Sequence, residues 1–427
     1  MNSLLRVPYA LAGAVAQGLS YVTPEGDSKL QRGLVARRGI LRRYRVWAAA
    51  SRDLSRPLAW FHAPSVGEGL QALPVIQLLR ARRPDVQVVY THYSPSAEQF
   101  ARSAGADYAD YLPFDRFGLA ASAISALRPT ALVFSKLDVW PAFTETAARS
   151  NVRTGVISAT LPESSARRGI IARYALGDAY RALDRVGAVS NEDAARLREQ
   201  GVRAERVSVT GDTRYDQVWA RSRGSDSPLV RSLRSSKVPT LVAGSTWPSD
   251  ETRVFEAWIE LRKRIPGARL IIAPHELSEA HLNGVAAWGH ANHLTVSRIA
   301  DPGAGGSDVV LVDRYGILGD LYAAGDAAYV GGGFHSAGLH SVLEPAAFGL
   351  PVLFGPRHGN SRDASVLIAC GGGFAVGGTP ELVWNLDMLL GSEKARDAAG
   401  VAARSMVQSG VGAAERSFQL VTELLDR

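Results

Sequence analysis

The residues with the clearest chemical potential lie between Gly331 and Pro356, in the sequence GGGFHSAGLHSVLEPAAFGLPVLFGP. Glycines let backbone N–H groups approach a ligand closely. A helix that begins near His340 or Ser341 would aim its positive end at an anion. Glu344, one turn into that helix, is placed to hold a ribose hydroxyl. The run indicates a nucleotide site, although a βαβ unit whose glycines only make turns would show the same pattern.

A second candidate follows the apolar run at 58–62, in the sequence APSVGEG. Glu68 would there be a carboxylate at the carboxyl end of a strand, where open α/β sheets bind ligands. Such a carboxylate can take a proton from an attacking hydroxyl. The alternative is structural, because Ser-x-x-Glu is also a capping box in which Ser65 caps the helix and Glu68 returns to its backbone. The motif alone leaves both interpretations open.

The segment SKLDVWP follows another apolar run, at 131–134. Lys136 and Asp138 alternate along an extended segment, so we expect both side chains to point the same way. A lysine at the end of a strand can bind a carboxylate or a phosphate as a point charge. A surface ion pair is the structural alternative.

Two further turns at predicted strand ends offer groups for an anion. Ser245 and Thr246 can donate from hydroxyls and backbone N–H groups to a phosphate, with plain helix capping as the alternative. His275, in the turn APHE, can contact an anionic donor when protonated and hydrogen-bond it when neutral. A lone histidine is equally often structural.

The composition is that of a soluble globular protein, with 46% hydrophobic and 21% charged residues. Cys370 is the single cysteine, so no intrachain disulfide can form. The sequence has no Cys/His cluster with metal-ligand spacing. It also lacks the Asp-x-Asp pair that carries a sugar-nucleotide metal, so we expect no metal site.

The net charge of +7 comes from the first 60 residues, which hold ten Lys or Arg and three Asp or Glu. The excess of positive charge lies at 29–45, directly after an apolar segment at 4–22. This arrangement indicates attachment to an anionic membrane surface, by an interfacial helix or a marginal single span; a removed signal peptide is a third possibility. Nucleic acid is the rival partner, but no zinc-finger spacing or RNA-binding aromatic motif accompanies the run. A solvated basic helix is the structural alternative.

Short apolar runs alternate with helical patterns through both halves, which predicts parallel sheets covered by helices. The expected strands are 58–62, 86–90, 131–134, 154–158, 185–189, 239–243, 269–273, 309–312, 327–330 and 352–354. The polar stretch 221–228 marks a boundary. We therefore expect a membrane-associated segment at 1–45, an N-terminal domain at 46–220 and a C-terminal domain at 221–410. A final helix at 411–427 is expected to pack back on the N-terminal domain.

The ordered motifs resemble those of the Kdo (3-deoxy-D-manno-octulosonic acid) transferases of Gram-negative bacteria. They are HAPSVGE, SKLDVWP, SATLPESS, SNEDAARL, TGDTRYD, GSTWPSDE, IIAPHE, DRYGILGDLYAAGDAAYVGGGF and LEPAAFGLPVLFGP, between about Trp60 and Gly410. The resemblance implies an α/β GT-B architecture, with two Rossmann-like domains facing a central cleft. It implies an inverting, metal-independent and cofactor-free transfer of Kdo from CMP-Kdo to a lipid A precursor, in lipopolysaccharide inner-core biosynthesis. The expected location is the cytoplasmic face of the inner membrane, with no nucleic-acid partner.

The same resemblance implies roles for single residues. Glu68 is the expected general base, with Ser65, Lys136 and Asp138 on the acceptor side, and Glu344 is expected to bind the cytidine ribose. The other expected donor-binding residues are Ser245, Thr246, His275, Gly338, His340 and Ser341.

Three positions depart from the pattern of many members. Lys136 stands where many have the first Glu of Glu-Thr-Glu-Leu-Trp-Pro, and Ser341 stands where many have Asn. The turn at His275 reads Ala-Pro-His-Glu instead of Ala-Pro-Arg-His, so an arginine is lost. These changes are typical of a divergent branch, an altered acceptor or a weakened enzyme.

Two other classes of function stay open from the sequence. One is a different GT-B nucleotide-sugar transferase or an epimerase, which would need no membrane segment. The other is a catalytically silent scaffold, which would bind CMP without transferring a sugar.

Overall fold

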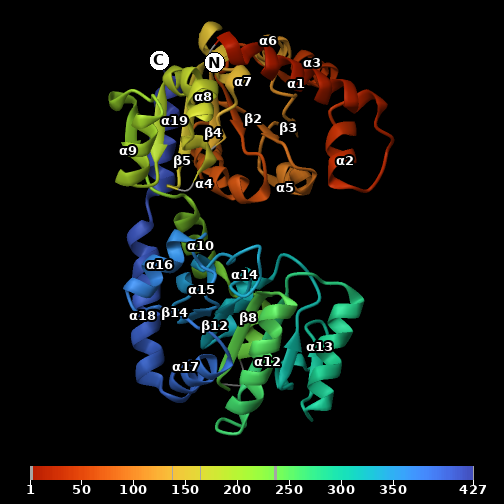
Figure 1. Cartoon of the computed structure of the whole chain (residues 1–427), viewed down its shortest axis with the longest axis vertical. Coiled ribbons are helices and arrows are strands. Elements are labelled where there is room, and N and C mark those ends of the chain that lie inside the picture. Colours follow the sequence, from red (N-terminus) through yellow and green to blue (C-terminus); the bar gives the residue numbers. More distant parts are fainter. Residues whose placement is uncertain (1–2, 137, 164, 235–237, 427) are drawn as a thin grey trace. The chain divides into compact units, whose positions relative to one another are not determined.

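The computed structural model describes residues 3–136, 138–163, 165–234 and 238–426. The chain divides into two compact units (Figure 1). The first runs to Asp216 and includes the segment from Gly412 onward, and the second spans Gln217–Val411. Each contains a parallel seven-stranded sheet covered by helices, which confirms the predicted α/β class.

The sheet of the first unit has the order β3-β2-β1-β4-β5-β6-β7. Its strands are β1 Leu58–His62, β2 Gln87–His92, β3 Tyr108–Tyr111, β4 Ala131–Ser135, β5 Arg153–Ala159, β6 Arg185–Ala188 and β7 Val207–Val209. Its helices are α1 Ser3–Val22, α2 Lys29–Val35, α3 Ile40–Ser51, α4 Val66–Arg82, α5 Glu98–Ser103, α6 Phe117–Leu127, α7 Pro141–Arg149, α8 Ile170–Ala182, α9 Asn191–Glu199 and α19 Ala413–Leu425. Helix α10, Arg214–Gly224, begins in this unit and ends in the next.

The sheet of the second unit has the order β10-β11-β9-β8-β12-β13-β14. Its strands are β8 Thr240–Thr246, β9 Arg269–Pro274, β10 Val296–Arg298, β11 Val309–Leu311, β12 Ala327–Val330, β13 Val352–Phe354 and β14 Gly373–Ala375. Its helices are α11 Pro228–Arg234, α12 Pro248–Arg262, α13 Glu279–Ala291, α14 Leu318–Leu321, α15 Leu343–Ala347, α16 Arg362–Ala369, α17 Thr379–Gly391 and α18 Glu393–Gly410.

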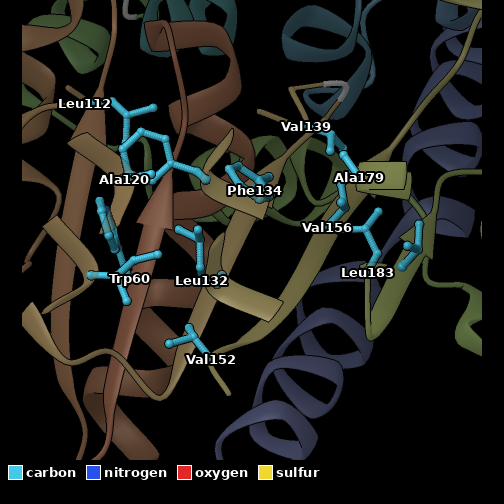
Figure 2. Packing of buried hydrophobic residues seen from close by; sticks show 14 of the residues in the cluster. Trp60, Leu112, Ala120, Leu132, Phe134, Val139, Val152, Val156, Ala179 and Leu183 are labelled. Carbon is cyan, nitrogen blue, oxygen red and sulfur yellow. The ribbon is translucent and has the colours of Figure 1, made fainter. Parts of the chain in front are cut away.

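Alternating side chains of the first sheet build two separate cores, as the two-residue period of a strand requires. Trp60 and Phe134 pack on the face covered by α3, α6, α7 and α8 (Figure 2). Phe61 and Val133 face the other side, beneath α4 and α19. Helix α19 buries Phe418 in that second core, so the end of the chain is part of the first unit.

Helix α1 is held to the first unit by polar side chains. Arg6 donates to Glu145 at 2.8 Å. The hydroxyl of Tyr9 donates to Asp115, whose carboxylate also accepts two backbone N–H groups at the start of α7. Burial raises the pKa of Asp115 to about 6. In the described ranges, no helix combines the length and apolar character that crossing a membrane requires.

The basic run at 29–45 is only partly a surface feature. Arg37 is buried, with its guanidinium over the ring of Tyr93 at 3.9 Å and hydrogen bonds to three backbone carbonyls. Arg38 donates to two carbonyls at the end of α1, and Arg43 makes a bidentate pair with Asp110. These three arginines stabilise the fold. The charge pattern of the sequence did not distinguish them from arginines that are free at the surface. Within the described residues, the exposed cations without an ion pair in this run are Lys29, Arg32, Arg42 and Arg45.

Candidate active site

Glu68 lies in the first turn of α4, at the carboxyl edge of the first sheet. The hydroxyl of Ser65 donates to its Oε2, and Nζ of Lys136 donates to its Oε1 at 3.1 Å. Lys136 directly follows β4, which is the neighbour of β1 in the sheet. The side chain of Ser65 makes no hydrogen bond to the helix backbone, so the capping-box interpretation is wrong. Instead, the carboxylate of Glu68 is positioned by two side chains at adjacent strand ends.

The surroundings of Glu68 keep its carboxylate ionised. Burial alone would raise its pKa, since the side chain is only 16% exposed. The hydrogen bond from Ser65 and the ammonium of Lys136 outweigh this effect, and the pKa of Glu68 is lowered. Glu68 can therefore accept a proton at neutral pH.

Asp138 lies near Glu68 but is not positioned as the alternation argument predicted. Lys136 adopts a left-handed conformation, with φ of 67°, so the backbone there is not extended; residue 137 lies outside the described residues. The carboxylate of Asp138 accepts from Arg167 at 2.6 Å, and burial raises its pKa. Arg167 is a residue that the sequence did not indicate. We call Glu68, Lys136, Asp138 and Arg167 the Glu68 cluster.

The second candidate site lies at the carboxyl ends of β9, β8 and β12, which are neighbours in the second sheet. Its central residue is Asp250, which is fully buried in the first turn of α12. The carboxylate accepts from the N–H groups of Trp247 (3.0 Å), Gly332 (2.8 Å) and Phe334 (3.2 Å), and from the hydroxyl of Tyr329 (3.0 Å). Asp250 therefore ties the start of α12 to the loop at 331–342, called the glycine loop below.

The glycine loop does not lead into the helix that we expected. Helix α15 begins at Leu343, so the prediction of a helix start near His340 or Ser341 was wrong. The N–H of His340 donates back to the carbonyl of Gly331 at 3.2 Å, which keeps this segment in the loop. Gly332 has φ of 95°, and a Cβ there would lie 2.2 Å from the carbonyl oxygen of Gly338. The close folding of the loop on itself therefore requires glycine.

Of the two hydroxyls predicted at the end of β8, only one is free to meet a ligand. Thr246 is buried, and its hydroxyl donates to Glu251 at 2.8 Å. The other oxygen of Glu251 contacts Nε2 of His281 at 2.7 Å. Ser245 is partly exposed and has a left-handed φ of 54°, a strain that is often found at functional sites.

Four aromatic rings stack beside the glycine loop. Trp247 stacks on His335 and on His275, with ring centroids 4.0 and 4.4 Å apart, and His275 stacks on His340 at 4.6 Å. Nε1 of Trp247 donates to Nε2 of His340 at 3.3 Å, and burial lowers the pKa of His340. His340 is therefore a neutral acceptor at neutral pH. Trp247 and His335 were missed by the sequence interpretation, although both follow predicted strands.

Glu344 lies in the first turn of α15, with its side chain 32% exposed. Burial raises the pKa of Glu344, and the charge of Asp320 adds to this increase. The guanidinium of Arg221, 3.8 Å away, lowers the pKa, but the net change is upward. Arg221 also donates to Asp320 at 2.8 Å. The carboxylate of Glu344 thus keeps an oxygen available to hydroxyl donors.

Ser341 is exposed and Gly338 is partly exposed. Among the described residues, no three His, Cys, Asp or Glu side chains are grouped to hold a metal ion.

The two parallel sheets with their helices form an α/β fold of the GT-B type. It is similar to the UDP-GlcNAc 2-epimerase from Neisseria meningitidis, solved bound to UDP-GlcNAc, with a TM-score of 0.64, 15% identity, and coverage of 87% of this chain and 99% of that one. A putative UDP-N-acetylglucosamine 2-epimerase from Listeria monocytogenes gives a TM-score of 0.62 at 14% identity, covering 86% and 96% of the chains. At such identities the likeness shows the fold alone.

Sequence comparison gives a more specific similarity than the fold. Residues 36–217 match the family model described as 3-deoxy-D-manno-octulosonic-acid transferase (kdotransferase). The 3-deoxy-D-manno-octulosonic acid transferase of Bordetella pertussis is 29% identical over 405 residues, which cover 89% of this chain and 90% of that protein. The protein of the same name from Chlamydophila psittaci (strain ATCC VR-125 / 6BC) is 28% identical over 328 residues, 74% of each chain. Residues 36–217 therefore match a Kdo transferase domain, and most of the chain is similar to Kdo transferases, which are glycosyltransferases.

Proposed function

We propose that this protein transfers Kdo from CMP-Kdo to a lipid A precursor in lipopolysaccharide biosynthesis. The observation that carries the proposal is the ionised, largely buried carboxylate of Glu68 at the carboxyl edge of the first sheet. Open α/β sheets bind their ligands at this edge, and Glu68 lies within the range that matches the family. The Glu68 cluster then forms the acceptor side of the reaction.

In the proposed reaction, Glu68 takes the proton from a sugar hydroxyl of the acceptor. The freed oxygen forms a bond to the anomeric carbon of Kdo, and the bond from that carbon to the phosphate oxygen breaks. The electron pair leaves with CMP. Attack from the side opposite the phosphate inverts the anomeric centre. We propose that protein groups alone meet the charge of the leaving phosphate, without a metal ion.

The pair between Lys136 and Glu68 has a further role in this scheme. The ammonium that keeps Glu68 ionised also lowers its basicity. An anionic acceptor offers Lys136 a second partner. As that contact forms, the ion pair loosens and the pKa of Glu68 rises toward that of a stronger base. Substrate binding would thereby activate the base.

On the donor side, we propose that the glycine loop and Ser245 bind the phosphate of CMP. Asp250 holds the backbone of the loop in place by accepting from the N–H groups of Gly332 and Phe334, so the loop needs no rearrangement when the phosphate arrives. His340, in the loop, and His275, which stacks on it, would contact the phosphate or the Kdo carboxylate. Glu344 would accept hydrogen bonds from the ribose hydroxyls.

Replacing Glu344 with alanine is expected to weaken CMP binding by about 1–3 kcal/mol, roughly 5- to 150-fold, because buried hydrogen bonds to ribose are lost. Calorimetric titration with CMP measures this change, with Glu260→Ala, at an exposed position of α12, as the control. Burial raises the pKa of Glu344, and only the ionised form accepts from both hydroxyls. Wild-type affinity should therefore fall as the pH is lowered through that pKa, and the variant should lack this fall. Equal affinity of the two proteins would exclude the ribose role.

The first unit carries an apolar surface that suits the proposed location at the cytoplasmic face of the inner membrane. Along α1, spaced three or four residues apart, the exposed side chains are Val7, Leu11, Val15, Leu19 and Val22. Helix α8 contacts α1 and exposes Ile170, Ile171 and Tyr174. An apolar stripe beside exposed cations favours binding in the plane of an anionic membrane.

Substituting Leu11 and Val15 together by aspartate is expected to lower vesicle binding at least about tenfold, since burying each side chain contributes about 1.5–3 kcal/mol. Both residues are about 60% exposed, so folding should be unaffected. Sedimentation with anionic vesicles measures the loss. Val401→Asp is the matched control, because Val401 is 66% exposed on α18 of the second unit. Equal binding of the double variant and the wild type would contradict this surface.

The proposed reaction is tested by following CMP release from CMP-Kdo, which is generated in situ because it is labile. We expect release to depend on the lipid A precursor. Release that is independent of any acceptor, or no release at all, would overturn the proposal.

A further inference from the structure

A cavity of about 740 Å³ lies in the first unit, between α3, α5 and β3, and contains none of the residues used above for catalysis. Its volume is within the range of sites that hold small molecules, roughly 300–1,000 Å³. Four arginines and two carboxylates line it: Arg38, Arg42, Arg43, Arg102, Glu98 and Asp110. The lining is therefore positive.

The positive charge is concentrated on two of these arginines. Asp110 neutralises Arg43 through two hydrogen bonds of 2.7 and 2.9 Å, and Glu98 pairs with Arg102 at 2.6 Å. Arg42 is exposed, and its side chain has no ion pair or hydrogen bond within the described part of the chain.

The other free charge belongs to Arg38, which donates only to backbone carbonyls, those of Ser20 and Thr23. His92, also in the lining, adds no charge, because burial lowers its pKa. Two guanidinium groups without a carboxylate partner favour an anion, and phosphate matches their geometry.

Aromatic side chains also line the cavity. Trp47 stacks on Tyr108, with centroids 5.0 Å apart and the planes at 18°. Val46, next to Trp47, also lines the cavity and is exposed. A site that combines cations with aromatic and aliphatic groups suits an amphiphile better than a free anion. Arg38 also holds the end of α1, so the cavity is directly connected to the helix that carries the exposed apolar stripe.

We infer that this cavity binds the phosphate headgroup of an anionic membrane lipid. The phosphate contacts Arg42 and Arg38, and the first carbons of the lipid chains lie against Trp47 and Val46. The inference rests on the membrane association included in the proposed function, and it adds a specific lipid site to it. It does not depend on the transfer reaction.

The test compares Arg42→Gln with Arg45→Gln, both on α3. Arg45 is exposed, has no ion pair among the described residues and does not line the cavity, so both variants lose the same charge. Binding to phosphatidylcholine vesicles that contain phosphatidylglycerol is expected to fall about tenfold or more in Arg42→Gln, as for a lost charge-assisted hydrogen bond. Arg45→Gln should lose no more than about fivefold, the effect of one cation near a surface. Equal losses would mean diffuse attraction and would overturn the site.

Two further arms separate the possible outcomes. Millimolar inorganic phosphate should not displace the wild-type protein from the vesicles; displacement that depends on Arg42 would assign the site to free phosphate instead of a lipid. CMP release with a detergent-dispersed acceptor should be the same in Arg42→Gln as in the wild type. If the wild type released no CMP but the difference between the two variants persisted, the proposed reaction would fail and the lipid site would stand.

Discussion

Glu68→Gln is expected to lower kcat about a thousandfold and to leave CMP affinity unchanged. Glutamine has the shape of glutamate, and its amide oxygen can still accept from Ser65 or Lys136, so the local structure should persist. It cannot take a proton, and a positioned base contributes about 10²- to 10⁴-fold to a rate. The CMP site is proposed in the second unit, so binding should be independent of this change.

Steady-state kinetics and calorimetry with CMP measure the two quantities separately. Glu199→Gln, at an exposed position of α9, is the control for a lost carboxylate in the same unit. The lowered pKa of Glu68 places the acidic limb of the wild-type kcat/KM profile below the usual carboxylate range, with activity falling as the pH drops through it. The residual activity of the variant should lack that limb. A variant with wild-type turnover would refute the assignment of Glu68 as the base.

Asp250→Ala is expected to destabilise the second unit by about 3 kcal/mol or more. The substitution removes a fully buried carboxylate and leaves three backbone N–H groups and one tyrosine hydroxyl without their acceptor. Each unsatisfied buried donor costs about 1–3 kcal/mol, partly offset by water that enters the space. CMP affinity should fall as well, because Asp250 fixes the backbone of Gly332 and Phe334.

Urea unfolding with fluorescence detection measures the change in the free energy of unfolding. Glu260→Ala, an exposed position on the same helix, should change it by less than about 0.5 kcal/mol. If Asp250→Ala behaved like this control, the four hydrogen bonds would contribute nothing to stability. The glycine loop would then need another explanation for its shape.

The central strands could be predicted from the sequence because they are buried on both faces. Strands β1, β4, β8 and β12 each contain a continuous apolar run. The strands that the prediction missed are β3, β7, β10 and β14, which lie at the outer ends of the two sheets. Strand β7 reads Val-Ser-Val, with its last two residues exposed, and β10 is only partly buried along its length. An edge strand with one wet face lacks the apolar run that identifies a strand.

The candidate site was predictable where a residue directly follows a strand or a glycine run. Glu68, His275 and Glu344 were proposed in this way, and their roles stay predictions. Arg167 and Arg221 could not, because each meets its carboxylate partner across a long stretch of chain. The interaction of Thr246 with Glu251 was also hidden, since a hydroxyl at a strand end looks the same in sequence whether it faces a ligand or a buried carboxylate.

The most direct test of the proposed function is the mass of the acceptor after incubation with CMP-Kdo. Wild-type protein should convert the lipid A precursor to a product heavier by one or more Kdo residues, and Glu68→Gln should give almost none in the same time. An unchanged acceptor mass with wild-type protein that still binds CMP would contradict Kdo transfer and favour a CMP-binding scaffold.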